Sequence, residues 1–188
     1  ASMRAGDAAA AALAFEAVMQ SSAPTPALLN DLGLCHAQLG RHGQAEQAFL
    51  QALALDEQCT PARVNLGNLC LRINDPERAA AAYRRALEDV PEDALVWNHL
   101  ALSLCSAGRA GEAMQCSRRA LQLAPDDETV RANLIFALVL APEAGTPELF
   151  EETRRWAALR AEGLTAQAPA HDNPPDPERT LRVGYVSA

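Results

Sequence analysis

One pattern of small, aromatic and proline residues occurs three times in succession along this chain, at intervals of about 34 residues. In residues 60–93 its positions are Leu66, Gly67, Ala79, Tyr83, Ala86 and Pro91. The preceding copy has Leu32, Gly33, Ala45, Phe49 and Ala52, and the following copy has Leu100, Ala101, Ala113, Ala120 and Pro125. A repeat of this length is typical of solenoids, in which each unit buries its apolar face against the next. We therefore predict an all-α fold, a right-handed superhelix of antiparallel helix pairs.

Composition supports helices and excludes several classes of function. Alanine, leucine, arginine and glutamate, which favour helix, are abundant, and no stretch is apolar for the roughly 18 residues that a membrane span needs. The formal net charge of −8 argues against nonspecific binding to nucleic acid or to acidic lipid. All basic residues are arginine, which excludes lysine-based catalysis within these residues. We expect no nucleic-acid partner, no membrane partner and a cytoplasmic location.

The five cysteines are spread over three repeats and form no Cys-x-x-Cys pair. Zinc binding and a disulfide framework are therefore not expected, and reduced thiols are the simplest interpretation. We expect no cofactor and no metal in these residues. Cys70 and Cys105 are interpreted as small buried hydrophobic residues.

The repeat positions divide the chain into consecutive segments. Residues 1–162 are predicted to form the superhelix, with a half repeat at 1–25, full repeats at 26–59, 60–93 and 94–127, and a divergent repeat at 128–162. Residues 163–180 are proline-rich and are predicted to be an extended linker. Residues 181–188 read LRVGYVSA, a short β-branched and aromatic run that predicts one strand at the start of a further domain.

Local signals predict how each helix pair is built. In residues 26–59 we expect helices near Pro26–Leu39 and Gln44–Leu55. The turns between paired helices carry residues that tolerate a left-handed backbone, namely Gly40, Asn74 and Gly108. Asp75 is predicted to cap the helix that follows it, with Pro76 at the first position. Small residues at Gly33, Gly67 and Ala101 are expected where paired helices approach closely, and Ser117, in place of Phe49 and Tyr83, predicts looser packing.

These positions resemble the tetratricopeptide repeat, and three full copies in one register make the resemblance strong. The C-terminal residues HDNPPDPERTLRVGYVSA, from His171, resemble the entry to the catalytic domain of O-linked N-acetylglucosamine transferases, especially bacterial, SPINDLY-type relatives. The helix over Arg154–Glu162 is similar to the one that this family places just upstream. The resemblance implies transfer of N-acetylglucosamine from UDP-N-acetylglucosamine to serine or threonine of proteins. None of the family's catalytic residues is present in these 188 residues, so the chain by itself is expected to be inactive.

The position before each Leu-Gly pair is expected to face the concave groove. It is occupied by Asp31, Asn65, His99 and Asn133. The transferase family carries an asparagine ladder at this position, which holds the backbone of an extended polypeptide, and this chain departs from it at Asp31 and His99. An asparagine amide matches the N–H and C=O of a peptide unit. We therefore predict a peptide-binding groove centred on Asn65 and Asn133, with further contacts from Asn30, Asn68 and Asn98.

Two other functions remain open alongside acceptor recruitment for a glycosyltransferase. One is a non-enzymatic adaptor whose groove binds a partner protein, and the other is self-association, as a homodimer, through the convex face.

The adjacent Cys35 and His36 point about 100° apart on a helix and cannot chelate an ion together. His42 and His171 are interpreted as solvated, and the arginine pairs at 84–85 and 118–119 as decoration of the convex face.

Overall fold

The computed structural model describes residues 5–141 and 146–165, and within them the chain forms nine α-helices and no strand. The helices are α1 (Ala5–Ser21), α2 (Pro26–Gln38), α3 (His42–Leu55), α4 (Thr60–Arg72), α5 (Pro76–Asp89), α6 (Ala94–Ser106), α7 (Ala110–Leu123), α8 (Glu128–Leu140) and α9 (Thr146–Thr165). Because α9 continues to Thr165, the prediction that the linker begins at Gly163 is wrong by three residues. The rest of the predicted linker and the strand at 181–188 lie outside the described residues.

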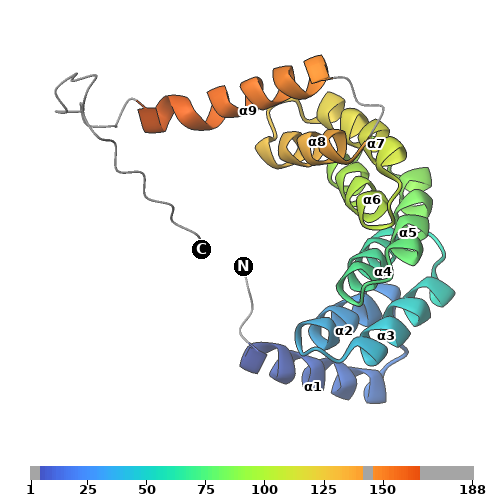
Figure 1. The fold of residues 1–188 in the computed structure, drawn as a ribbon. Coiled ribbons are helices and arrows are strands. Elements are labelled where there is room, and N and C mark those ends of the chain that lie inside the picture. Colours follow the sequence, from blue (N-terminus) through green and yellow to red (C-terminus); the bar gives the residue numbers. More distant parts are fainter. Residues whose placement is uncertain (1–4, 142–145, 166–188) are drawn as a thin grey trace, which may run out of the picture.

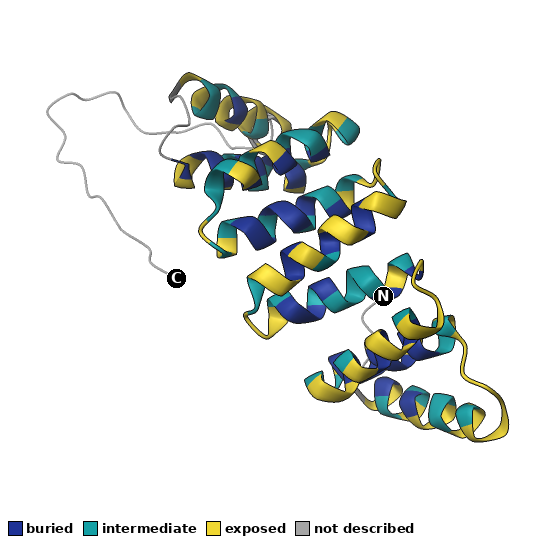
Figure 2. Ribbon diagram, turned by 90° about the vertical axis from the view of Figure 1, so that its right-hand side faces the viewer, coloured by how far each residue is buried: buried dark blue, intermediate teal, exposed yellow. Residues whose placement is uncertain are grey.

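The helices stack as an open arc (Figure 1). The first helix of each pair, α2, α4, α6 and α8, lies on the inner side of the arc, and α3, α5 and α7 lie on the outer side. The unpaired α1 packs against α2 at one end, and α9 packs against α8 at the other. This arrangement confirms the all-α solenoid. Figure 2 views the stack from its outer side, where exposed residues alternate with buried ones along the helices.

The turns between paired helices contain the predicted left-handed residues. Gly40, Asn74 and Gly108 have φ angles of 72°, 59° and 75°. Asn74 is the only non-glycine residue with positive φ in the described part of the chain, and asparagine tolerates this conformation better than most residues. The Asp75 side chain accepts a hydrogen bond from the Arg78 backbone N–H at 3.2 Å, with Pro76 at the start of α5. The predicted turn and cap chemistry is confirmed.

Within a pair, an aromatic ring of the outer helix lies directly over a glycine of the inner helix. A Cβ added to Gly33 would come within 2.5 Å of Phe49 Cε1, and one added to Gly67 within 2.7 Å of Tyr83 Cε1. Both rings are almost fully buried, so neither can move aside freely. In the third repeat, Ala101 takes the place of the glycine and Ser117 takes the place of the aromatic residue. Ser117 is completely buried. The looser packing expected at Ser117 therefore does not appear as exposure.

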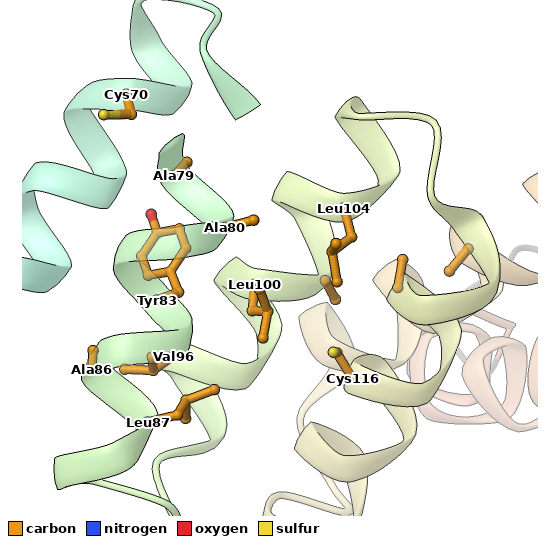
Figure 3. Close-up of a cluster of buried hydrophobic side chains, with 13 residues drawn as sticks. Cys70, Ala79, Ala80, Tyr83, Ala86, Leu87, Val96, Leu100, Leu104 and Cys116 are labelled. Atoms are coloured by element: carbon orange, nitrogen blue, oxygen red, sulfur yellow. The ribbon is translucent and has the colours of Figure 1, made fainter. Parts of the chain in front are cut away.

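The main hydrophobic cluster lies between repeats. Tyr83 on α5 belongs to one buried cluster with Val96 and Leu100 of α6, and Leu104 and Cys116 extend this cluster into the next pair (Figure 3). Each outer helix therefore packs against its own inner helix and against the inner helix of the following repeat. This shared burial is what makes the stack one cooperative unit.

One recurrent contact was not predicted from the sequence. At the same position of three successive inner helices, a side chain donates a hydrogen bond to the backbone carbonyl six residues earlier. Trp97 Nε1 donates to Pro91 O at 2.9 Å, Arg131 Nη2 donates to Pro125 O at 2.6 Å, and Arg63 contacts the Glu57 carbonyl in the same way. These bonds tie each inner helix to the loop before it, and arginine and tryptophan are interchangeable here because both present N–H donors on a long side chain.

Candidate functional site on the inner face

The four predicted ladder positions lie in one register on the inner helices. Asp31 is on α2, Asn65 on α4, His99 on α6 and Asn133 on α8. Asp31 is exposed and the other three side chains are half-buried. The structure therefore places all four on the helices that form the inner side of the arc (Figure 1). Their chemical surroundings differ from one junction between repeats to the next.

Two junctions are bridged by pairs of asparagine amides. Asn65 Nδ2 donates to Asn30 Oδ1 at 2.8 Å, which joins α4 to α2. Asn133 Nδ2 donates to Asn98 Oδ1 at 2.9 Å, which joins α8 to α6 in the same geometry. Asn30 and Asn98 are 8% and 4% exposed, whereas their partners reach the surface. Asn30 and Asn98, predicted only as additional contacts, thus form the inner half of each pair.

The junction between α4 and α6 is built differently. The residues at the corresponding positions are Val64 and His99, which form no such bridge. The His99 ring packs against the Tyr83 ring, with centroids 5.5 Å apart and planes tilted by 41°. Burial lowers the pKa of His99, and its Nδ1 makes no hydrogen bond to a described residue. His99 is therefore held largely by packing.

Asn68 is also engaged within the fold. Its Oδ1 accepts a hydrogen bond from the Tyr83 hydroxyl at 2.7 Å. Desolvation raises the pKa of Tyr83 far above its ordinary value, so this hydroxyl stays a donor throughout the usual pH range. The oxygen of Asn68 is thus used to satisfy a buried phenol, and only its amide N–H groups remain for an external partner.

Asn65 and Asn133 each keep unused hydrogen-bonding capacity. Each amide spends one N–H on its buried partner and makes no other hydrogen bond to described residues. The carbonyl oxygen and the second N–H of each side chain remain, which are one acceptor and one donor. That set is complementary to the N–H and C=O of a peptide unit. The buried partner also holds each amide in one orientation, which reduces the entropy lost on binding.

An open depression lies beside each amide pair. One, of about 900 Å³, lies between the N-terminal ends of α6 and α8 and is lined by residues that include Asn98, Asp93, Asp127 and Thr129. The other, of about 420 Å³, lies between the N-terminal ends of α2 and α4. It is lined at the equivalent positions, two repeats earlier, by Asn30, Thr25, Cys59 and Pro61. The two depressions are called the α6/α8 depression and the α2/α4 depression below.

The outer helices use their polar side chains in ion pairs. Consecutive outer helices are joined by pairs of arginine and glutamate, which are Arg78 with Glu46, Arg84 with Glu112, Arg109 with Glu77, and Arg118 with Glu148. The hydrogen bonds from Arg118 hold the pKa of Glu148 below its usual range. The interpretation of Arg84 and Arg118 as outer-face residues is confirmed, with the addition that they link neighbouring repeats.

The described residues contain no group of three or more histidine, cysteine, aspartate or glutamate side chains suited to hold a metal ion. None of the described helices is long and apolar enough to cross a membrane.

The five cysteines are free thiols, and all are buried except Cys105, which is half-buried, so the prediction of a buried Cys105 is only partly right. His36 is buried between α1 and α2, 3.9 Å from Glu16.

Comparison with solved structures shows which folds resemble this one. A double mutant of MamA RS-1 superposes with a TM-score of 0.77 at 19% sequence identity, covering 84% of this chain and 88% of that one. A second MamA structure gives a TM-score of 0.75 at 17% identity, covering 88% and 90%. MamA 41-end from Desulfovibrio magneticus RS-1 gives 0.67 at 20% identity, covering 72% and 76%. At these identities the similarity concerns the fold alone.

Sequence comparison identifies the repeats. The chain is 29% identical over 127 residues to the human protein O-mannosyl-transferase TMTC3, which covers 68% of this chain but only 14% of that protein. Residues 26–59 and residues 64–128 each match a tetratricopeptide repeat family model. These two ranges include most of the inner and outer helices described above. The chain therefore belongs to the tetratricopeptide repeat proteins.

Proposed function

We propose that the inner face of this solenoid binds an extended segment of a partner protein through the backbone of that segment. The observation that carries this proposal is the pair of amide bridges, Asn30–Asn65 and Asn98–Asn133. Each bridge presents an oriented amide beside an open depression, and the two bridges occupy equivalent positions two repeats apart. A groove that reads backbone groups accepts many sequences, as a scaffold for protein interactions requires.

We further propose that the bound segment is an acceptor for protein O-glycosylation. Two independent similarities support this assignment. The C-terminal residues resemble the entry to the catalytic domain of O-linked N-acetylglucosamine transferases. The matching human relative is named as a protein O-mannosyl-transferase, although it is matched over only 14% of its length. In this proposal the repeats recruit the acceptor, and a catalytic domain outside these residues uses UDP-N-acetylglucosamine as donor.

Peptide binding is tested with an Asn65→Ala/Asn133→Ala double variant and an array of serine- and threonine-containing 15-residue peptides. If one backbone hydrogen bond of about 0.5–1.5 kcal/mol is lost at each amide, the double variant should bind roughly 5- to 150-fold more weakly. The matched control is Gln51→Ala/Gln115→Ala, which removes two exposed amides from the outer helices α3 and α7 and should leave binding unchanged. Equal binding by both variants, with melting curves showing that both are folded, would overturn the proposal.

The glycosylation step has its own test in the natural full-length protein. Calorimetry should show binding of UDP-N-acetylglucosamine, and transfer to array peptides should decline in the Asn65→Ala/Asn133→Ala variant while donor binding stays the same. If the full-length protein binds acceptor peptides but not the nucleotide sugar, the adaptor function is the correct one. Loss of donor binding in the groove variant would show that the substitution disturbs more than acceptor recruitment.

A further inference from the structure

The two depressions share an acidic lining. Their lining includes five carboxylates that form no ion pair with any described residue. These are Glu92, Asp93 and Asp127 in the α6/α8 depression and Asp31 and Asp56 in the α2/α4 depression. On the outer helices, by contrast, glutamates are paired with arginines from the neighbouring repeat. Other carboxylates without an ion pair to a described residue, such as Asp7 and Asp126, lie outside the depressions, but these five are gathered beside the amide pairs.

A second observation points to a ligand at the α6/α8 depression. Asn98 lines this depression and is 4% exposed, and its Oδ1 is occupied by Asn133. Its amide nitrogen makes no hydrogen bond to any described residue. This nitrogen is not one of the fully enclosed polar atoms without a partner, so it is free to donate to a group in the depression. A backbone carbonyl of a bound segment would accept this hydrogen bond.

The helix N-termini that surround each depression weaken its negative potential without reversing it. An exposed helix N-terminus is equivalent to about half a positive charge. Two N-termini meet at each depression, so about one positive charge opposes the carboxylates there. Three carboxylates in the α6/α8 depression leave a clear negative excess, and two in the α2/α4 depression leave a smaller one. The α6/α8 depression is therefore the stronger cation site.

We propose, on the basis of the function proposed above, that the bound segment is basic and places one arginine or lysine side chain in each depression. A metal ion is not the expected occupant, because the carboxylates do not converge into a coordinating group within the described residues. Packed helices lie about 8–10 Å apart, so two repeats separate the depressions by roughly 16–20 Å. An extended chain advances about 3.3 Å per residue, so the two cationic residues are about five or six positions apart.

The test uses fluorescein-labelled 14-residue peptides with a Gly/Ser/Thr background and two arginines. The arginines are placed either six positions apart or adjacent, and a third peptide has none. The spaced peptide is expected to bind about three- to tenfold more tightly than the peptide without arginine, as expected for two partly exposed ion pairs, and to lose this advantage at high salt. Equal affinity for all three peptides overturns the basic-segment proposal but leaves backbone binding intact. Absence of binding by every peptide overturns both.

The variants separate local recognition from long-range charge. Asp93→Asn/Asp127→Asn removes two charges from the α6/α8 depression and keeps both helix caps, because asparagine caps as well as aspartate. Asp31→Asn/Asp56→Asn removes two charges from the α2/α4 depression and should reduce peptide affinity less. The control is Asp7→Asn/Asp126→Asn, which changes net charge equally at exposed residues outside both depressions. An equal loss of affinity in the control shows that only net charge attracts the peptide, which contradicts the proposal.

Discussion

The inner and outer helices of this solenoid use their polar side chains in opposite ways. On the outer side, arginines of one repeat pair with glutamates of the next, as Arg84 pairs with Glu112 and Arg118 with Glu148. On the inner side, neutral amide pairs join α2 to α4 and α6 to α8, and the carboxylates that line the nearby depressions make no ion pair with described residues. Both sides hold the repeats together, but the inner side gathers unpaired carboxylates and amides with free hydrogen-bonding groups beside two depressions.

This difference explains why the inner face is the candidate binding surface. Exposed ion pairs contribute little to stability, with a typical contribution of about 0–1 kcal/mol, but they neutralise the surface that carries them. Oriented amides satisfy each other while still leaving a donor and an acceptor free. The stability of variants that remove single contacts shows how strongly the fold depends on each type of contact.

The largest effect is expected at a buried ion pair between the inner helix α8 and the last described helix, α9. Arg131 on the inner helix α8 pairs with Glu152 on α9, and both side chains are about 9% exposed. Arg131→Met should lower the free energy of unfolding by about 3 kcal/mol, because Glu152 loses its buried partner. Arg155→Met is the control, since Arg155 is 61% exposed and pairs with the same Glu152. Equal loss of stability in urea unfolding of the two variants would contradict this assignment.

The next effect concerns the contact between an inner glycine and an outer aromatic ring. Gly67→Ala places a Cβ about 2.7 Å from two atoms of the Tyr83 ring, which is fully buried. Overpacking of this kind should cost about 1–3 kcal/mol, visible as a lower melting temperature. Gly43→Ala is the matched control, because nothing lies within 4 Å of the added Cβ and alanine favours helix. A stable Gly67→Ala variant would show that the ring can move aside.

A smaller effect of opposite sign is expected in the third repeat. Ser117 is fully buried and its hydroxyl has no hydrogen-bond partner among described residues. Ser117→Ala should therefore raise the free energy of unfolding by about 1 kcal/mol. Ser103 is equally buried, but its hydroxyl donates to the His99 carbonyl at 2.8 Å. Ser103→Ala should give no such gain, and a similar gain from both would rule out the unpaired hydroxyl as the cause.

The smallest effect is a pH dependence at the junction without an amide bridge. Burial lowers the pKa of His99 below its ordinary value, so the folded protein binds this proton more weakly than the unfolded chain. The resulting stability is present above the ordinary histidine pKa of about 6.5 and is lost as the pH falls below it. The urea midpoint should decline between pH 7.5 and 5.5, and His99→Phe should show a smaller decline. An identical decline would assign the effect to other groups, including His36, whose pKa is also lowered by burial.

Much of this fold was predictable because its signals are local and recur. The left-handed turns at Gly40, Asn74 and Gly108 and the cap at Asp75 each depend on the conformational preference of one residue. The close approach at Gly33 and Gly67 followed from the spacing of small and aromatic residues within one repeat. The C-terminal limit of α9 was misplaced because the proline-rich linker was predicted to begin at Gly163, although the helix runs to Thr165.

The candidate site was predictable as positions but not as interactions. Periodicity made Asp31, Asn65, His99 and Asn133 equivalent positions, and the resemblance to the tetratricopeptide repeat predicted that they face the groove. It did not reveal that Asn65 and Asn133 are tied to Asn30 and Asn98 in the preceding repeat. A comparison of residues 35 positions apart, one more than the repeat length, could have suggested these partners.

The sequence by itself determined the repeat, its turns and the helices that line the groove, since these depend on residues close together in the chain. Only the tertiary structure decided which polar groups on those helices remain free. A free donor, acceptor or charge is defined by what neighbouring repeats do not supply: Asp127 forms no ion pair with a described residue, whereas Arg118 pairs with Glu148. Hydrogen bonds and ion pairs form across distances of a few ångströms, so their partners are set by the stacking of helices and not by position in the chain.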